Sequence, residues 1–176
     1  MDIYKTPFNE VIYFLLTENI TSQFGITSLM LSIRYLNSDI YNFFHGKIYI
    51  HNFIHLIDTS LVNYVHQVNI RDIFGLTPLI RALFTIQPLL LINYLLNNNA
   101  DINISDIYGY HIIDYIAKFS NDIKNSDEIL KILLLMKRDN INIERSIQFA
   151  KDIKIRNILI NSIYLTINQL QEMLSI

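Results

Sequence analysis

A short turn pattern that recurs along the chain constrains its fold more than any other feature. The segment 24–29 has an aromatic residue, then glycine, then the start of an apolar helical pattern. It recurs at 74–79 and, more weakly, at 108–113. These turns contain three of the four glycines in the 176 residues, and the second and third are 34 residues apart. A repeat of this length is a helical pair that cannot bury its apolar face alone and has to stack on its neighbours.

The second turn begins the best-defined repeat. Gly75 supplies the positive φ of a tight turn at no steric cost. Thr77 is placed to cap the following helix, and Pro78 stands at its first position, where a missing donor is harmless. A second helix is expected over 89–96, and the asparagines at 97–99 tolerate left-handed termination. The apolar residues expected on one face of the first helix are Leu79, Ala82 and Leu83.

This repeat resembles the ankyrin repeat, whose pattern begins Asp-x-x-Gly-x-Thr-Pro-Leu-His-x-Ala and closes with Leu-Leu and Gly-Ala-Asp-x-Asn. The start matches from Asp72 to Ala82, the end matches at 95–103, and the pattern restarts at Asp106. The chain departs from the family at Ile80, which replaces histidine and removes a hydrogen bond between repeats, and at Asn99, which replaces glycine. The resemblance implies an all-α ankyrin-repeat solenoid of stacked helix pairs with short β-hairpin loops, with about four to five repeats including degenerate caps.

The resemblance implies a single ankyrin-repeat domain over residues 1–176. Gly25 and Gly75 are 50 residues apart, and the surplus at 37–59 is either an insertion or a degenerate helix pair. In the repeat that follows, Ser126 or Asp127 is expected to cap the second helix. The expected parts are an N-terminal cap helix at 1–21, a repeat with an insertion at 22–71, the best-matching repeat at 72–105, a repeat at 106–139, and a C-terminal degenerate repeat and cap at 140–176.

Composition excludes several classes of protein. The net charge of -2 and the pI of 6.2 argue against a nucleic-acid-binding protein. The absence of cysteine excludes a disulfide framework and a thiol nucleophile. The chain has neither a secretory signal pattern nor an apolar run as long as a membrane-spanning helix. We expect a cytoplasmic protein (host cytoplasm for a viral protein), with neither a nucleic-acid nor a membrane partner.

Residues that suggest catalysis or metal binding are few. His51 and His55 are four apart, which would place two imidazoles on one helix face, but no third ligand stands nearby. The sequence has no Gly-rich phosphate loop, no Gly-x-Ser-x-Gly and no His-Glu-x-x-His. His111 takes the place of the repeat threonine, which predicts a local capping role. We expect no enzyme, no cofactor and no metal; a metal protein or enzyme that uses His51 and His55 is the alternative.

The aromatic residues before the turn glycines are the main candidates for function. The resemblance implies that they lie near the tips of hairpins that project from the stack. They would either pack along adjacent hairpins or serve as apolar anchors for a partner. The candidate tip residues are Phe24, Ile73, Phe74, Ile107 and Tyr108. The inner helices would extend this surface through Arg34, Tyr35, Arg81, Thr85, Tyr115 and Lys118.

These observations favour a non-catalytic protein–protein interaction module that binds a host or cellular regulatory protein. The chain has 34 isoleucines and 19 asparagines against 17 residues of Gly, Ala, Pro and Arg together, which indicates an AT-rich genome. In this respect it resembles the small ankyrin proteins of AT-rich large DNA viruses such as poxviruses, which implies modulation of host innate signalling. The alternative is a scaffold that self-associates through its apolar C-terminal helix, which is expected over 165–176. The expected state is a monomer or a weak homo-oligomer.

Overall fold

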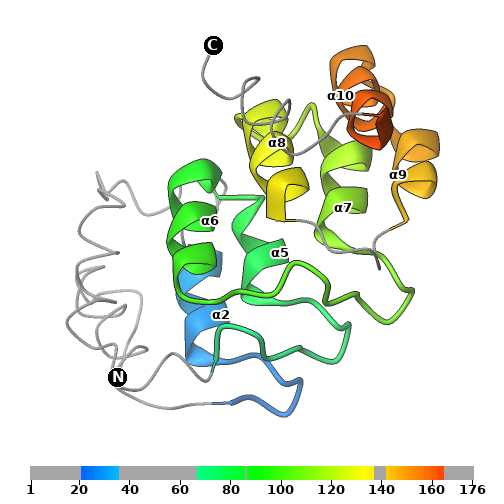
Figure 1. Cartoon of the computed structure of the whole chain (residues 1–176). Coiled ribbons are helices and arrows are strands. Elements are labelled where there is room, and N and C mark those ends of the chain that lie inside the picture. The colour runs from blue at the N-terminus through cyan, green and yellow to red at the C-terminus, as the bar shows by residue number, and fades with distance from the viewer. Residues whose placement is uncertain (1–20, 36–66, 86, 137–141, 165–176) are drawn as a thin grey trace. The chain divides into compact units, whose positions relative to one another are not determined.

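The computed structural model describes residues 21–35, 67–85, 87–136 and 142–164 (Figure 1). Within these ranges the chain contains seven helices and no strand, which confirms the predicted all-α class. Thr21 and Thr27 form an isolated antiparallel bridge. The chain divides into two compact units, residues 1–100 and residues 101–176. Each unit is described by itself below.

The first unit contains α2 (Ser28–Tyr35), α5 (Pro78–Ala82) and α6 (Pro88–Asn97). Helix α5 packs against α2 and against α6 (Figure 1). Apolar side chains at helical spacing fill the space between the three helices. The buried residues are Leu29, Met30, Ile33, Leu79, Ile80, Ala82, Leu83, Leu91, Ile92 and Leu95.

Local signals determine where these helices begin and end. The Thr77 hydroxyl accepts from the Ile80 N–H at 3.3 Å, and Pro78 is the first residue of α5, as predicted. Thr27 caps α2 in the same way, through the Met30 N–H at 3.3 Å. Helix α6 extends one residue further at each end than expected. The backbone of Asn99 just beyond it has a φ of 64°, which confirms left-handed termination.

The second unit contains α7 (Ile112–Phe119), α8 (Ser126–Met136), α9 (Ile143–Phe149) and α10 (Ile153–Tyr164). The first helices of the two pairs, α7 and α9, pack against each other, and so do the second helices, α8 and α10. Contacts between α7 and α8 and between α9 and α10 complete the unit. The buried core consists of Ile112, Ile113, Ile116, Ala117, Ile129, Leu130, Leu133, Ile155, Ile158 and Leu159.

The start of α8 differs from the prediction. Neither Ser126 nor Asp127 is the cap, because the helix already begins at Ser126. Asn125 precedes it with a φ of 55°, and its carbonyl accepts the first intrahelical bond from the Ile129 N–H at 3.0 Å. An asparagine tolerates the left-handed conformation that this entry into the helix requires.

Several expectations fall outside the described residues. They concern the N-terminal cap helix at 1–21, of which only Thr21 is described, the segment 37–59 with His51 and His55, and the final helix over 165–176. Among the described helices, none is long and apolar enough to cross a membrane.

Candidate functional site

Two turns, each with an exposed aromatic residue directly before its glycine, share the same pattern of hydrogen bonds. The Asp72 carboxylate Oδ1 accepts from the backbone N–H groups of Phe74 and Leu76, both at 2.9 Å. Asp106 Oδ1 accepts from the N–H groups two and four residues further on, at Tyr108 and Tyr110, both at 2.8 Å. One carboxylate oxygen therefore holds the backbone of each turn in place.

The three turn glycines all take the predicted positive φ. Their φ angles are 70° at Gly25, 77° at Gly75 and 78° at Gly109. Each glycine N–H donates to the carbonyl of the residue three positions earlier, at 2.8 to 3.1 Å. In the first turn Ser22 takes the place of the aspartate, and its hydroxyl accepts from the Phe24 and Ile26 N–H groups at 3.2 Å.

The predicted tip residues are exposed. Phe74 is 54% exposed and Tyr108 is 73% exposed, and Phe24, Ile73 and Ile107 are each about half exposed. Aromatic side chains of this size are usually buried in a monomer. The turn bonds hold their backbone, so the side chains project from an ordered support.

In the first unit two turns lie side by side (Figure 1). The Ile73 N–H donates to the Phe24 carbonyl at 2.9 Å. A Cβ placed on Gly25 would lie 3.2 Å from the Cα of Asp72 and 3.3 Å from the carbonyl oxygen of Arg71. Gly25 is therefore required both by its φ and by the close approach of the second turn. This contact brings Phe24, Ile73 and Phe74 together at one edge of the unit.

Two of the predicted inner-helix residues hold the second oxygen of the turn carboxylates. Arg81 forms an ion pair with Asp72 Oδ2. Nine residues after Asp106, at the same position, the Tyr115 hydroxyl donates to Asp106 Oδ2 at 2.7 Å. Arg81 and Tyr115 thus support the turns from the first helix of each repeat, rather than pointing freely at a partner.

The other inner-helix candidates differ in accessibility. Thr85 is buried and its hydroxyl donates to the Ala82 carbonyl at 2.8 Å, so its inclusion in a binding surface was wrong. Lys118 is exposed, and its Nζ lies 5.4 Å from the centroid of the Phe119 ring. The side chains of Arg34 and Tyr35 lie outside the described part of the structure.

The second unit contains a pocket of about 240 Å³ beside the turn at 106–110. Five of its lining residues are aromatic and two are aspartates. Tyr115 and Phe119 stack with centroids 6.3 Å apart, and Phe149 meets Tyr110 edge-on at 5.5 Å. The lining residues are Asp106, Tyr108, Tyr110, Asp114, Tyr115, Lys118, Phe119 and Phe149.

The sequence indicated Tyr108, Tyr115 and Lys118 but missed the rest of this pocket. Tyr110 and Phe119 stand two and four residues from residues that were singled out, so helical and turn spacing could have suggested them. Phe149 comes from α9, 34 residues after Tyr115. At that distance the signal in the sequence is the repeat period, which stacks successive first helices but does not show which of their side chains meet.

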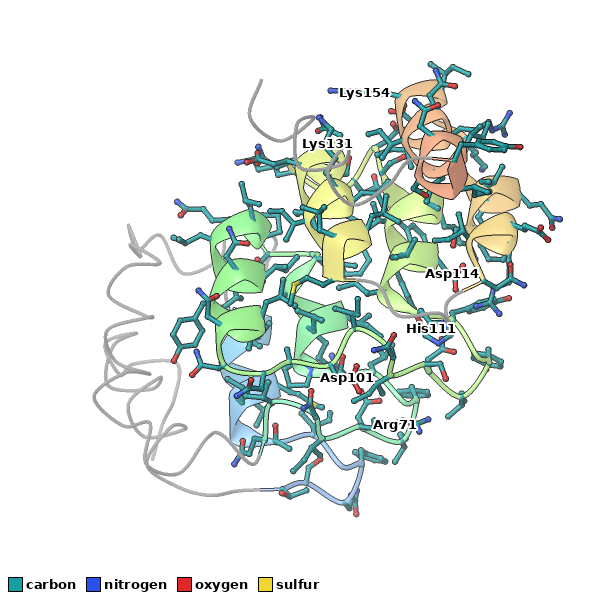
Figure 2. The ribbon with its side chains drawn as sticks, in the orientation of Figure 1. Arg71, Asp101, His111, Asp114, Lys131 and Lys154 are labelled. Atoms are coloured by element: carbon teal, nitrogen blue, oxygen red, sulfur yellow. The ribbon has the colours of Figure 1, made fainter. Side chains whose placement is uncertain are left out.

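Asp114 forms a buried polar cluster next to the pocket. It follows the N-cap residue His111 by three positions, as Ile80 follows Thr77, and Figure 2 places it with His111 at the start of α7. The Asp114 carboxylate accepts from the Ser146 hydroxyl at 2.7 Å and from the His111 N–H at 2.9 Å. It also forms an ion pair with Arg145, whose guanidinium donates to the Gly109 carbonyl at 2.7 Å. These bonds tie α7 to α9.

His111 is the N-cap residue of α7, as predicted, and its ring is held neutral. Burial lowers the pKa of the imidazole; the positive charge of Arg145 lowers it further, and Asp114 and Asp106 oppose both effects. Its Nδ1 lies 3.4 Å from Arg145 Nη2, so the neutral ring can accept a hydrogen bond there. A proton on Nδ1 would instead face the guanidinium.

The acidic side chains of the site are engaged in structural bonds. In the ranges that the structure describes, no group of three His, Asp or Glu side chains could hold a metal ion. The buried carboxylates of Asp72, Asp106 and Asp114 are engaged in turn, cap and helix-to-helix bonds. Comparison of the chain with protein-family models, with curated proteins and with solved structures gives no match.

Proposed function

We propose that this chain is a non-catalytic protein-binding module of the ankyrin-repeat type. The observation that carries this proposal is the exposure of large apolar side chains on ordered turns, above all Phe74 and Tyr108. Aromatic side chains dominate the energetics of protein interfaces. An ordered backbone reduces the entropy that is lost when such residues bind a partner. In each unit the partner surface would comprise the turn tips and the adjoining faces of the first helices.

The spacing of the turns, the threonine caps and the helix packing support the ankyrin part of the proposal. In each unit the first helices of successive repeats contact each other, α2 with α5 and α7 with α9. This is the arrangement that a stack of helical pairs requires. The resemblance to small ankyrin proteins of AT-rich large DNA viruses makes a host regulatory protein the class of partner that we propose.

Capture from host-cell lysate with quantitative mass spectrometry tests this function. We expect the Phe74→Ala, Tyr108→Ala double variant to lose the captured protein, while the wild-type chain retains it. Two truncations of about 2 kcal/mol each would weaken the complex by roughly a thousandfold at 1.4 kcal/mol per decade. The matched control is the Ile153→Ala, Tyr164→Ala double variant, which removes residues that are 67% and 80% exposed on α10. It should capture the protein as the wild type does.

Thermal unfolding separates binding from packing. The tip variant should unfold close to the wild-type temperature, whereas Leu79→Ala, at a fully buried position, should lose about 2–5 kcal/mol. A large drop in melting temperature for the tip variant, with capture intact, would mean that these aromatics pack the hairpins and do not bind a partner.

A second function is supported by α10. This helix exposes four large hydrophobic residues, Ile153, Ile160, Ile163 and Tyr164. An apolar face of this kind is suited to pairing with a second copy of the chain, as in a self-associating scaffold. Light scattering distinguishes the two functions: a dimer that the Ile153→Ala, Tyr164→Ala variant converts to a monomer would favour the scaffold.

A further inference from the structure

The buried carboxylates of Asp72 and Asp106 occupy the same position in their turns but have different partners. Both are nearly inaccessible, at 6% and 4% exposure, and both hold two backbone N–H groups through Oδ1. Asp72 Oδ2 pairs with the Arg81 guanidinium, so that the turn is electrically neutral. Within the described part of the chain, Asp106 Oδ2 accepts a bond from the neutral hydroxyl of Tyr115 alone. The turn at 106–110 therefore keeps a net negative charge.

None of the described charged groups near Asp106 serves as the counter-ion of its carboxylate. Arg145 pairs with Asp114, and burial lowers the pKa of His111 so that its ring is neutral at pH 7. Lys118 is exposed, with its ammonium over the Phe119 ring. Among the described residues, no cation forms an ion pair with Asp106. A buried carboxylate without a counter-ion is unfavourable and attracts a cation from outside.

The pocket beside Asp106 suits a cation in both size and lining. Its volume of about 240 Å³ is below the 300–1,000 Å³ that is typical for drug-sized ligands, and it corresponds better to one side chain. Aromatic faces attract cations. Two cations of the chain already rest on lining residues: the Arg145 guanidinium lies 5.2 Å from the Tyr110 ring centroid, and the Lys118 ammonium lies 5.4 Å from that of Phe119.

We propose that this pocket binds the guanidinium of an arginine side chain that the partner protein presents. The guanidinium would pair with Asp106 as Arg81 pairs with Asp72 in the other unit. A guanidinium fits better than an ammonium because it is planar, weakly hydrated and able to stack on aromatic rings. Asp106 Oδ2 accepts one bond from Tyr115 and has capacity for another. This inference rests on the proposed function, for which it names the chemistry of the partner.

A titration of the isotope-labelled full chain with N-acetyl-L-arginine amide, followed by NMR, tests the pocket. We expect shift changes confined to residues around 106–119 and 149. N-acetyl-L-citrulline amide, which has nearly the same shape but no charge, should bind at least about tenfold more weakly, as should the lysine analogue. Equal binding of the citrulline probe, equal binding of the lysine probe, or no change in the pocket up to the solubility limit would overturn the inference.

Three variants test whether the arginine probe binds at Asp106. Asp106→Asn keeps an oxygen for the two turn N–H groups but removes the charge, so it should lose binding of the arginine probe. Asp72→Asn makes the matched change in the first unit and should bind the probe as the wild type does. Tyr115→Arg introduces an arginine that can pair with Asp106 as Arg81 pairs with Asp72. Its side chain should fill the pocket, so that the probe no longer binds. Wild-type binding by Asp106→Asn or by folded Tyr115→Arg would contradict the proposal.

The outcomes separate this inference from the proposed function. A captured partner that depends on Phe74 and Tyr108, together with no binding of the arginine probe, would refute the arginine pocket and leave the proposed function standing. Selective binding of the probe in the pocket, together with a failure of the tip variant to affect capture, would support the pocket and refute the tip interface.

Discussion

The turns at 72–76 and 106–110 have the same backbone but differ in what faces the buried carboxylate. In both, one aspartate oxygen holds two N–H groups, and a glycine with positive φ closes the turn. The residue nine positions later is Arg81 in one and Tyr115 in the other. The local hydrogen bonds specify the turn, whereas this single position sets its charge. A repeat can therefore change from a neutral turn to a charged pocket without changing its backbone.

A second pair of equivalent positions shows the same principle within the helices. Ile80 is buried among apolar side chains in the first unit, whereas the equivalent Asp114 is buried in a polar cluster with Ser146 and Arg145. The first unit joins α2 and α5 through apolar contacts. The second unit joins α7 and α9 through a hydrogen-bonded carboxylate as well, so its stability depends on charge.

The largest effect is expected at Asp114. Asp114→Asn removes the charge opposite the partly buried guanidinium of Arg145 and also weakens the bonds from Ser146 and His111, so it should cost about 3 kcal/mol. Ile80→Val, at the equivalent position, should cost only about 0.5–1.5 kcal/mol. Urea denaturation of both variants measures the difference. Equal losses would mean that the polar cluster does not join the helices of the second unit.

A smaller effect is expected at the turn carboxylates. Asp72→Asn leaves the partly buried guanidinium of Arg81 without its counter-ion and should cost about 1.5–3 kcal/mol. Asp106→Asn keeps the turn bonds, and its amide can donate to the Tyr115 hydroxyl, so it should cost less than about 1 kcal/mol. Denaturation midpoints that rank the two variants in the opposite order would mean that Asp106 has an internal cation after all.

The turn glycines give the next test. Alanine at Gly25 or Gly109 has to adopt a left-handed conformation, which costs roughly 1–2 kcal/mol. At Gly25 the added Cβ also presses on the backbone of residues 71 and 72, whereas at Gly109 the nearest atom is the end of the Arg145 side chain at 3.9 Å. Gly25→Ala should therefore unfold at a clearly lower temperature than Gly109→Ala. The same melting temperature for both would rule out the close contact of the first two turns.

Local features were predictable from the sequence because their causes are local. The positive φ of the turn glycines, the Thr77 cap, Pro78 at the start of α5 and the end of α6 near Asn99 all follow from the residues that form them. The all-α class follows from the periodicity. The exposure of Phe74 and Tyr108 agrees with the hairpin-tip positions that the ankyrin resemblance implied.

The pocket was not predictable in the same way, because it depends on contacts between distant residues. Phe149 lines the pocket from α9. In the part of the chain that the structure describes, Asp106 has no counter-ion because Arg145 pairs with Asp114 instead. The roles of Arg81 and Tyr115 as partners of the turn aspartates also required the structure. Thr85 was misjudged because it lies three residues beyond the end of α5, where its hydroxyl donates back to the Ala82 carbonyl, and the sequence does not show this bond.

The smallest expected effect concerns the N-cap positions, where Thr77 and His111 are equivalent. The pKa of His111 is lowered in the folded chain from its ordinary value of 6.5, so the unfolded chain binds a proton there at a higher pH than the folded chain does. His111 therefore makes the free energy of unfolding rise with pH in the window below about pH 6.5. This contribution to stability is lost as the pH falls through that window. Replacing His111 by glutamine should make unfolding less sensitive to pH between about pH 5.5 and 7.5.

Thr77→Ala provides the contrast, because threonine does not titrate in this range. It should cost about 1 kcal/mol through the lost cap, and by the same amount at every pH. Urea denaturation of the wild type and both variants at several pH values separates the two cases. The remaining histidines and the carboxylates are common to all three proteins, so the difference between the slopes of the wild type and His111→Gln belongs to His111. Parallel slopes for those two would mean that folding does not change the pKa of His111, so that Asp114 and Asp106 offset the effect of its burial.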